Sequence, residues 1–408
     1  MDRATTSWPA LAAALVALAG CSLTPSAARS SASPAGTATA TPAATGSGAA
    51  APAVEPPPGG PVPQRFEPNS LTFVSATEGW VLGTAPCSQP PCTSIVRTRD
   101  GGRTWKGIPA PKAALYWLTN QTGGVKALRF ADRLNGWAFG PELFVTHDGG
   151  GHWAAQPIPG GAPGGQVVDL EAAAGTVYAL VASGDPGRPR PVQLYRGAVG
   201  RDEWQPVTGV AAEGATITEG FGAGLVLHGR TAWALIGQDQ GEAVFATSDG
   251  SRWEPRTLPC LPPASGLALA TASDLLLVCG GGVAAGSQEK TAYVSHDAGR
   301  SFQRAGSPPS GGDLEGAAAA PGVALVSAAS GASFLYASFD GGRTWAEVFS
   351  APTGGEFWID LGMTTSSQGA AVLNHSRPEG SGYSEPPRLV MTRDGGHSWS
   401  QVAFTQAG

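Results

Sequence analysis

Charged side chains are scarce in this chain, which has 25 Lys and Arg against 31 Asp and Glu in 408 residues. They make up 14% of the sequence, compared with about 25% in an average protein. Lys and Arg do not gather into a basic run anywhere. Because nucleic-acid binding needs a positive face that neutralises phosphates, this composition argues against a nucleic-acid partner.

Helical periodicity is missing as well. No stretch repeats its apolar residues at the interval of an amphipathic helix, so we expect the folded part to be all-β. The apolar run at residues 11–18 is too short to cross a bilayer as a mature helix.

One short turn is repeated six times. Five copies read Ser/Thr-x-Asp-x-Gly-x-x-aromatic, and a sixth is one residue shorter. The copies are Thr98–Trp105, Thr146–Trp153, Ser295–Phe302, Ser338–Trp345, Thr392–Trp399 and the shorter Thr247–Trp253. An Asp carboxylate can accept backbone N–H bonds and Gly can take positive φ, so the pattern predicts a tight hairpin whose aromatic anchors the next strand. It resembles the Asp-box (BNR) repeat of β-propellers.

The spacing of the turns gives a blade count. Their Asp residues mostly recur every 43–54 residues or so, the period of propeller blades. The gap from Asp148 to Asp249 is about two periods, and Val192–Arg196 with Asp202–Trp204 fits a degenerate unit within it. Short strand-like runs such as Gly79–Gly83 precede each turn. We therefore predict a seven-bladed β-propeller of four-stranded antiparallel blades at residues 66–408, preceded by a disordered linker.

The repeated turns resemble structural hairpins on the outer edge of a propeller, away from its central channel. This resemblance implies that their aspartates form turns, namely Asp100, Asp148, Asp249, Asp297, Asp340 and Asp394. The His residues of the turns lie in different blades, so they are not expected to converge on one metal. We expect no metal site and no cofactor.

The N-terminus has the pattern expected of an export signal. Arg3 precedes the apolar run, which ends in Leu18-Ala-Gly-Cys21. This resembles a bacterial lipobox, in which the Cys is lipidated and becomes the first mature residue. Residues 1–20 are then a lipoprotein-type signal peptide, and the protein is expected on the outer face of the cytoplasmic membrane. The alternative is a plain secretory signal with an incidental Cys.

Residues 21–65 comprise Cys21 and a linker rich in Ser, Ala, Thr and Pro. The linker has almost no aromatic or large aliphatic residues, so it cannot bury a core and is expected to be disordered.

Four cysteines remain after Cys21, an even number that suits an exported protein. Cys87 and Cys92 flank a short loop, and Cys260 and Cys279 bracket the start of one blade. We predict two disulfides, Cys87–Cys92 and Cys260–Cys279. The alternative is buried free thiols.

Asp-box propellers include sialidases, so the resemblance also raises the possibility of a catalytic site. Sialidases carry an Arg-Ile-Pro motif, further substrate-binding arginines and a Tyr–Glu nucleophile pair. The nearest stretch here, Arg65–Pro68, lacks the motif, and none of the 6 Tyr stands in a sialidase context. Glu78, Asp132, Glu356 and Asp360 are candidate rim carboxylates, but solvated loop charge is the simpler interpretation of each. We assign no catalytic residue.

The closest resemblance of the whole domain is to the photosystem II stability/assembly-factor propellers and their bacterial relatives. It rests on a Gly-Trp strand paired with a downstream box, as in Phe130–Trp137 followed by Thr146–Gly150, and in Phe73–Trp80 followed by Thr98–Gly102. Several blades lack the Gly-Trp pair, so a role in photosynthesis does not follow. The resemblance implies a propeller that binds a protein or a surface ligand without chemistry.

We therefore expect a membrane-anchored, extracytoplasmic binding or assembly module, monomeric, whose partner is a protein or cell-surface ligand. The alternatives are a divergent exo-glycosidase of sialidase type and a structural cell-surface domain. Exposed aromatics beside inner strands are typical anchors of a binding face. The candidate face comprises Tyr116, Trp117, Lys126, Arg133, Glu356, Phe357 and Trp358. Packing between blades is the alternative for Trp117 and Trp358.

Overall fold

The computed structural model describes residues 54–116, 123–185, 188–215, 223–238, 241–260, 265–351, 356–375 and 386–404. The chain divides into two units, Met1–Pro52 and Ala53–Gly408, and the described residues belong to the second. The signal peptide, Cys21 and most of the linker lie outside the described residues, as does Trp117. All regular elements of the described part are β-strands. It contains no helix long and apolar enough to span a bilayer.

Five antiparallel sheets have four strands each, in the order of the chain. The first contains β1 (Glu67–Phe73), β2 (Gly79–Thr84), β3 (Thr93–Thr98) and β4 (Lys106–Ile108). The second contains β5 (Ala127–Phe130), β6 (Gly136–Phe139), β7 (Leu143–Thr146) and β8 (Ala154–Gln156). Another contains β17 (Ser265–Leu269), β18 (Leu275–Ala284), β19 (Ser287–Ser295) and β20 (Gln303–Gly306). The next contains β21 (Asp313–Ala320), β22 (Val323–Ala329), β23 (Ser333–Ser338) and β24 (Ala346–Ala351). The last contains β25 (Glu356–Met363), β26 (Gly369–His375), β27 (Arg388–Thr392) and β28 (Ser400–Gln401).

The sixth sheet has eight strands. They are β9 (Gln166–Ala173), β10 (Thr176–Ala182), β11 (Arg190–Ala198), β12 (Gln205–Ala215), β13 (Ala223–His228), β14 (Thr231–Gln238), β15 (Gly241–Thr247) and β16 (Glu254–Arg256). It joins two sets of four strands through the single pair Ala215–Gln238 between β12 and β14. The third and fourth blades, expected to be separate, therefore share a sheet. The physical reason is the length of β12, whose 11 residues carry it to the end of β14.

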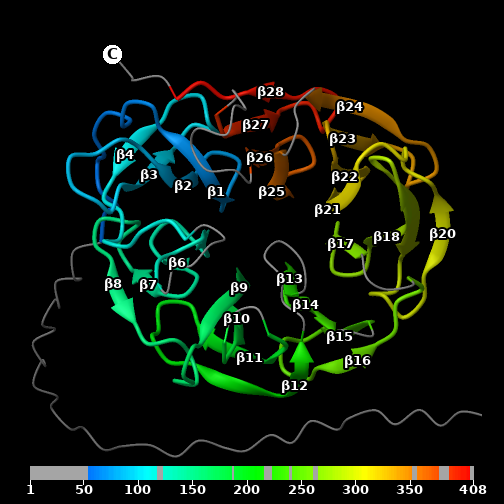
Figure 1. The fold of residues 1–408 in the computed structure, drawn as a ribbon, viewed down its shortest axis with the longest axis horizontal. Coiled ribbons are helices and arrows are strands. Elements are labelled where there is room, and N and C mark those ends of the chain that lie inside the picture. The colour runs from blue at the N-terminus through cyan, green and yellow to red at the C-terminus, as the bar shows by residue number, and fades with distance from the viewer. Residues whose placement is uncertain are drawn as a thin grey trace, which may run out of the picture. The chain divides into compact units, whose positions relative to one another are not determined.

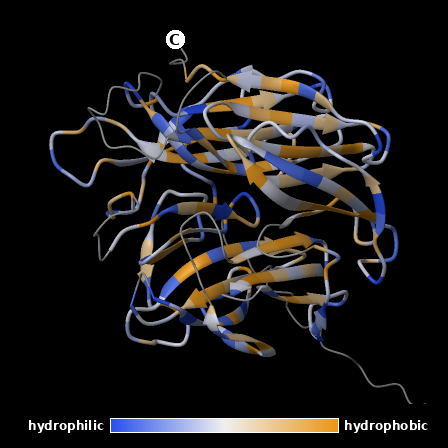
Figure 2. Cartoon of the chain, turned by 45° about the vertical axis from the view of Figure 1, so that its right-hand side comes forward, coloured by the Kyte–Doolittle hydropathy of each residue, from blue (hydrophilic) through white to orange (hydrophobic). Residues whose placement is uncertain are grey.

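Within this unit the sheets stand around a common centre, each with its first strand innermost (Figure 1). Each of the inner strands β1, β5, β9, β13, β17, β21 and β25 contacts the next, and β25 contacts β1. Apolar side chains fill the spaces between neighbouring sheets, and Leu71 and Val81 pack with Val372 and Leu389 to join the first sheet to the last. Figure 2 shows apolar residues concentrated along the strands. The expected all-β fold with several four-stranded antiparallel sheets is confirmed, and its arrangement is consistent with a β-propeller.

The inner strands β1 and β5 run side by side in the same direction. The Ser70 and Thr72 hydroxyls accept hydrogen bonds from the backbone N–H groups of Leu128 and Phe130 at 3.1 and 3.4 Å. This direction distinguishes two ends of the ring. At the loop end, where inner strands begin, lie the connections between second and third strands and between fourth and first strands. At the turn end lie the turns between first and second strands and the repeated Asp turns.

The repeated Asp residues lie in tight turns at the turn end. Asp100 Oδ1 accepts hydrogen bonds from the backbone N–H groups of Arg103 and Thr104 at 3.0 and 2.9 Å and from the Thr98 hydroxyl at 2.8 Å. Gly101 and Gly102 have φ of 74° and 79°, which side chains would disfavour. The other five Asp residues accept equivalent bonds, namely Asp148, Asp249, Asp297, Asp340 and Asp394.

A short segment ahead of β1 packs against the first sheet. We call residues Val54–Val62 the strap. The backbones of Gly60 and Gly107 exchange two hydrogen bonds of 2.8 and 3.0 Å, and the Pro57 carbonyl accepts a hydrogen bond from Arg97, which is 3% exposed. Val62 lies in the core between the first and last sheets. The folded unit therefore begins ahead of residue 66, the expected boundary, because these contacts order the end of the linker.

Candidate functional site: the polar inner strands

A largely buried arginine on β5 is held by two carboxylates from other strands. Arg129 donates through Nε to Glu171 on β9 and through Nη2 to Asp360 on β25, both at 2.6 Å. Its Nη1 donates to the Leu71 and Leu128 carbonyls at 3.1 and 2.9 Å. The three charged side chains are 11–27% exposed. Arg129 therefore links the second sheet to the sheets that contain β9 and β25.

Asp360 reaches Arg129 because β25 is irregular there. The pairing of β25 with β26 shifts register between Ile359 and Gly362, and Asp360 has φ of 52°. Asp tolerates this left-handed conformation better than most residues, and a bulge re-aims a side chain. The other carboxylate oxygen, Oδ2, accepts hydrogen bonds from the Ser70 hydroxyl at 2.6 Å and the Leu71 backbone N–H at 2.9 Å. One carboxylate thus joins β25, β1 and β5.

The same kind of bond recurs around the ring. Asp169 Oδ2 on β9 accepts from the backbone N–H of Leu225 on β13 at 2.7 Å. Glu315 Oε2 on β21 accepts from the backbone N–H of Trp358 on β25 at 2.7 Å. Each inner strand is the edge of its sheet, so its outward N–H groups lack partners in the sheet. Side-chain oxygens of the preceding inner strand supply those partners.

Burial raises the pKa of several of these carboxyls. It raises the pKa of Glu171 to about 7, against the opposing charge of Arg129. It raises the pKa of Glu315 to about 8, and the charge of Asp313 adds to the effect. Burial would also raise the pKa of Asp360, but the charge of Arg129 and the hydrogen bonds from Arg129, Ser70 and Leu71 together outweigh burial and hold that pKa below its ordinary value. Asp360 therefore stays ionised, whereas Glu315 is mostly protonated at neutral pH.

These contacts define what the inner strands can do chemically. The carboxyls of Asp169, Glu315 and Asp360 accept backbone N–H bonds, and Glu171 and Asp360 also bind Arg129. Within the described ranges, no three His, Cys, Asp or Glu side chains are grouped so that they could hold a metal ion. The arrangement is suited to holding neighbouring strands in register.

Lys290 on β19 is a second buried charge. Its ammonium lies within 3.2 Å of five backbone carbonyl oxygens, those of Gln288, Pro309, Ser310, Gly311 and Gly312. The side chain is buried, and burial lowers its pKa to about 8, against the opposing charge of Asp313. Lys290 therefore fixes the connection that leads into β21.

Four residues of the predicted binding face lie at the loop end. Tyr116 and Lys126 precede β5, and Tyr116 N donates to the Val125 carbonyl at 2.9 Å while the Lys126 carbonyl accepts from Asn69 at 2.7 Å. Glu356 and Phe357 open β25, where Glu356 pairs with Arg388 at 3.2 Å. These residues belong to the start of two inner strands that flank β1.

Two other members of that face lie elsewhere. Arg133 follows β5, so it lies at the turn end, across the length of that strand from Lys126. Trp358 is 7% exposed, packs edge-on against Phe349, and donates its indole N–H to the Ala328 carbonyl at 3.3 Å. Trp358 therefore packs between sheets, which was the alternative to a role in the binding face. Trp117 remains outside the described residues.

Both predicted disulfides are present. Cys87 is bonded to Cys92 in the connection between β2 and β3, and Cys260 is bonded to Cys279 at the end of the β18 segment that pairs with β17. They support an oxidising environment outside the cytoplasm.

Sequence reasoning did not single out Arg129, Asp169, Glu171, Glu315 or Lys290. The available signal was a charged residue inside a predicted inner strand, as with Arg129 in the run Ala127–Phe130. Such a residue faces either solvent or the centre of the ring, and only the positions of distant strands distinguish these cases.

No protein-family model and no curated protein sequence matches the chain. Among solved structures, YCF48 from Cyanidioschyzon merolae is similar with a TM-score of 0.50 and 16% identity, over 82% of this chain and 97% of that one. YCF48 bound to D1 peptide gives 0.49 and 17%, over 83% and 99%. A Mycobacterium tuberculosis puromycin-hydrolyzing peptidase gives 0.52 and 14%, over 83% of this chain and 53% of that one.

The chain thus spans about half of that peptidase and nearly all of YCF48 from Cyanidioschyzon merolae. At these identities the likeness is one of fold. It supports a β-propeller fold like that of YCF48 from Cyanidioschyzon merolae.

Proposed function

We propose that this protein is an exported, lipid-anchored, seven-bladed propeller that binds a protein partner at its loop end and carries out no chemistry of its own. The observation that carries the proposal is that the polar side chains of the inner strands bind neighbouring strands. Arg129 binds both Glu171 and Asp360, so the three side chains connect three sheets. A centre occupied by structural contacts favours a rigid frame that presents loops, which is how many binding domains work.

The loop end is the better candidate face because its connections are longer. β4 and β5 are joined through residues 109–126, and β26 and β27 through residues 376–387. At the turn end, by contrast, only Ala174 and Gly175 separate β9 from β10. Long connections on a rigid frame are where binding residues concentrate.

An exposed apolar tip supports the same face. β18 and β19 extend toward the loop end beyond the part of β18 that pairs with β17, and Val283 at the tip of this hairpin is 65% exposed. Tyr116 and Phe357 lie at the same end. Apolar and aromatic side chains within a polar border are typical of the centre of a protein interface.

Site-specific photocrosslinking on intact cells tests this proposal. A photoreactive phenylalanine analogue replaces Val283 at the loop end or, as matched control, Phe339, which is 37% exposed in the turn between β23 and β24. We expect a discrete crosslinked protein from position 283 and none of the same mass from position 339. A discrete product from position 339 alone would overturn the proposed face. The proposal would also fail if the analogue gave no product at position 283 and none when it replaces Tyr116.

A further inference from the structure

The two units that depart most from the repeat are neighbours. The third unit has Gly197–Trp204 where the others carry an Asp turn, and the fourth has the shortened turn Thr247–Trp253. They belong to the one sheet of eight strands. Tyr178 on β10 of the third unit donates its hydroxyl to the Gly250 carbonyl in the fourth unit at 2.9 Å. Both irregular turns therefore lie side by side at the turn end.

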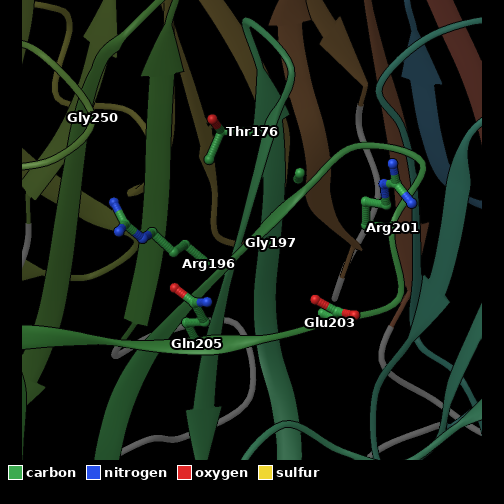
Figure 3. Close-up of a pocket in the computed structure, with 8 residues that line it drawn as sticks. Thr176, Arg196, Gly197, Arg201, Glu203, Gln205 and Gly250 are labelled. Atoms are coloured by element: carbon green, nitrogen blue, oxygen red, sulfur yellow. The ribbon is translucent and has the colours of Figure 1, made fainter.

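A pocket of about 290 Å³ lies between them. Arg196 at the end of β11 and Arg201 in the following turn lie on opposite sides of it, with Thr176, Glu203 and Gln205 around the same space (Figure 3). Gly250 of the fourth unit also lines it, and the pocket is open to solvent, since Arg201, Glu203 and Gln205 are exposed. The volume is close to the lower limit of typical small-molecule sites, about 300 Å³.

The two arginines are available to a ligand. In the described part of the chain, neither the Arg196 nor the Arg201 guanidinium has a hydrogen-bond or ion-pair partner. Arg230 nearby is different, because it donates twice to the Asp249 carbonyl at 3.0 and 2.7 Å. Each guanidinium offers five N–H donors and no acceptor. The pocket therefore presents more donors than acceptors, together with the single carboxylate of Glu203.

We propose that this pocket binds a small hydroxylated carboxylate of monosaccharide size, such as one acidic sugar unit. An arginine fork matches the geometry of a carboxylate. Hydroxyl groups donate and accept, so they suit the Thr176 hydroxyl, the Gln205 amide and the Glu203 carboxylate. Glu203 disfavours a ligand that is only an anion, because it would repel that anion without receiving a hydrogen bond. The site lies at the opposite end of the ring from the proposed protein face, so an experiment can contradict one proposal without contradicting the other.

Ligand-observed NMR titration of the full-length protein tests the site with three probes. Glucuronate carries both the carboxylate and hydroxyls, glucose lacks the carboxylate, and sulfate lacks the hydroxylated frame. We expect glucuronate to bind with a Kd on the order of 1 mM, the strength that about a dozen ligand atoms supply. Glucose and sulfate are expected to bind at least about tenfold more weakly, because each lacks one half of the recognition.

Variants then test whether glucuronate binds in this pocket. Arg196→Gln and Arg201→Gln each remove one unpaired guanidinium, and Ala198→Trp fills the pocket while keeping both arginines. Each should weaken glucuronate binding by about tenfold or more, with the unfolding temperature checked to confirm folding. Arg304→Gln, at an exposed position on β20, is the matched control and should bind as the parent does. Absence of glucuronate binding, equal binding of sulfate, or unchanged binding by all three pocket variants would overturn the proposal.

Discussion

Arg129 on β5 and Asp360 on β25 form a 2.6 Å ion pair although 231 positions separate them in the chain. β1 lies between the two strands, and its Ser70 and Leu71 bind the other oxygen of the same carboxylate. The pair therefore connects the last sheet, the first and the second.

Removing one partner of this pair should destabilise the fold strongly. Arg129→Met leaves two carboxylates buried without their cation, and we expect a loss of about 3–5 kcal/mol in the free energy of unfolding. Asp360→Asn keeps a residue that tolerates positive φ and still removes the charge. Chemical denaturation of both single variants and of the double variant measures their coupling. Losses that simply add would show that the two side chains do not act together.

Glu315 should make the protein less stable as the pH rises through neutrality. Its pKa is raised from 4.5 to about 8 in the folded state, so the folded protein holds a proton that the unfolded chain has lost. The free energy of unfolding should therefore decrease as the pH rises from about 4.5 to about 8. Glu315→Gln should reduce this slope, whereas Glu289→Gln, at an exposed position, should retain it. Denaturant titrations at several pH values measure the slope, and identical slopes in all three proteins would contradict the prediction.

Lys290 should act in the next pH range and with the opposite sign. Its pKa is lowered from 10.5 to about 8, so between these values the unfolded chain holds a proton that the folded protein lacks. Stability should rise with pH across that range. Lys290→Met should lack this rise and should also lose stability at pH 7, because the carbonyl oxygens around the ammonium lose its three N–H donors. Denaturant titrations extended to pH 10 measure this rise in the free energy of unfolding. If the rise persists in the variant, Lys290 is not its cause.

The two disulfides should contribute unequally. Cys260 and Cys279 are 19 positions apart, whereas Cys87 and Cys92 are 5 apart. Because cross-linking a longer loop removes more entropy from the unfolded chain, replacing Cys260 and Cys279 with Ser should cost about 3 kcal/mol and replacing Cys87 and Cys92 about 2 kcal/mol. Thermal unfolding of the two double variants compares them. Non-reducing peptide mapping should first recover both pairs, and full alkylation of all four thiols without reductant would rule the pairs out.

Cys21 should attach the protein to the membrane. The motif Leu18-Ala-Gly-Cys21 motivates this proposal, and acyl chains contribute about 0.8 kcal/mol per buried CH₂. Cys21→Ser should release the protein from the membrane fraction or block its processing. Fractionation of cells that express each form, followed by immunoblotting, measures this. A substituted protein of mature size that still sediments with membranes would show that lipid on Cys21 is not the anchor.

Much of the fold could be predicted because the repeat encodes it locally. Gly79–Gly83 was expected as a strand and β2 covers Gly79–Thr84, since a turn of defined chemistry fixes where each strand ends. The shared sheet of the third and fourth units was not foreseen, because the pairing of Ala215 with Gln238 depends on how far β12 extends.

The site could be predicted less well. Tyr116, Lys126, Glu356 and Phe357 lie at the start of inner strands, as their sequence positions indicated, and their role in binding stays a prediction. Arg133 was misplaced because β5 separates it from Lys126. The contact of Arg129 with Asp360 depends on closure of the ring and on a positive φ, and neither can be read from local sequence.

The strap determines how the domain responds to mechanical load. A pull on the chain ahead of Val54 reaches the Pro57 contact with Arg97 and the two Gly60–Gly107 hydrogen bonds before it reaches β1. The strap must therefore detach before β1 bears the load. Detachment of the strap would lengthen the chain ahead of β1 while the contacts between β1, β5 and β25 remain intact.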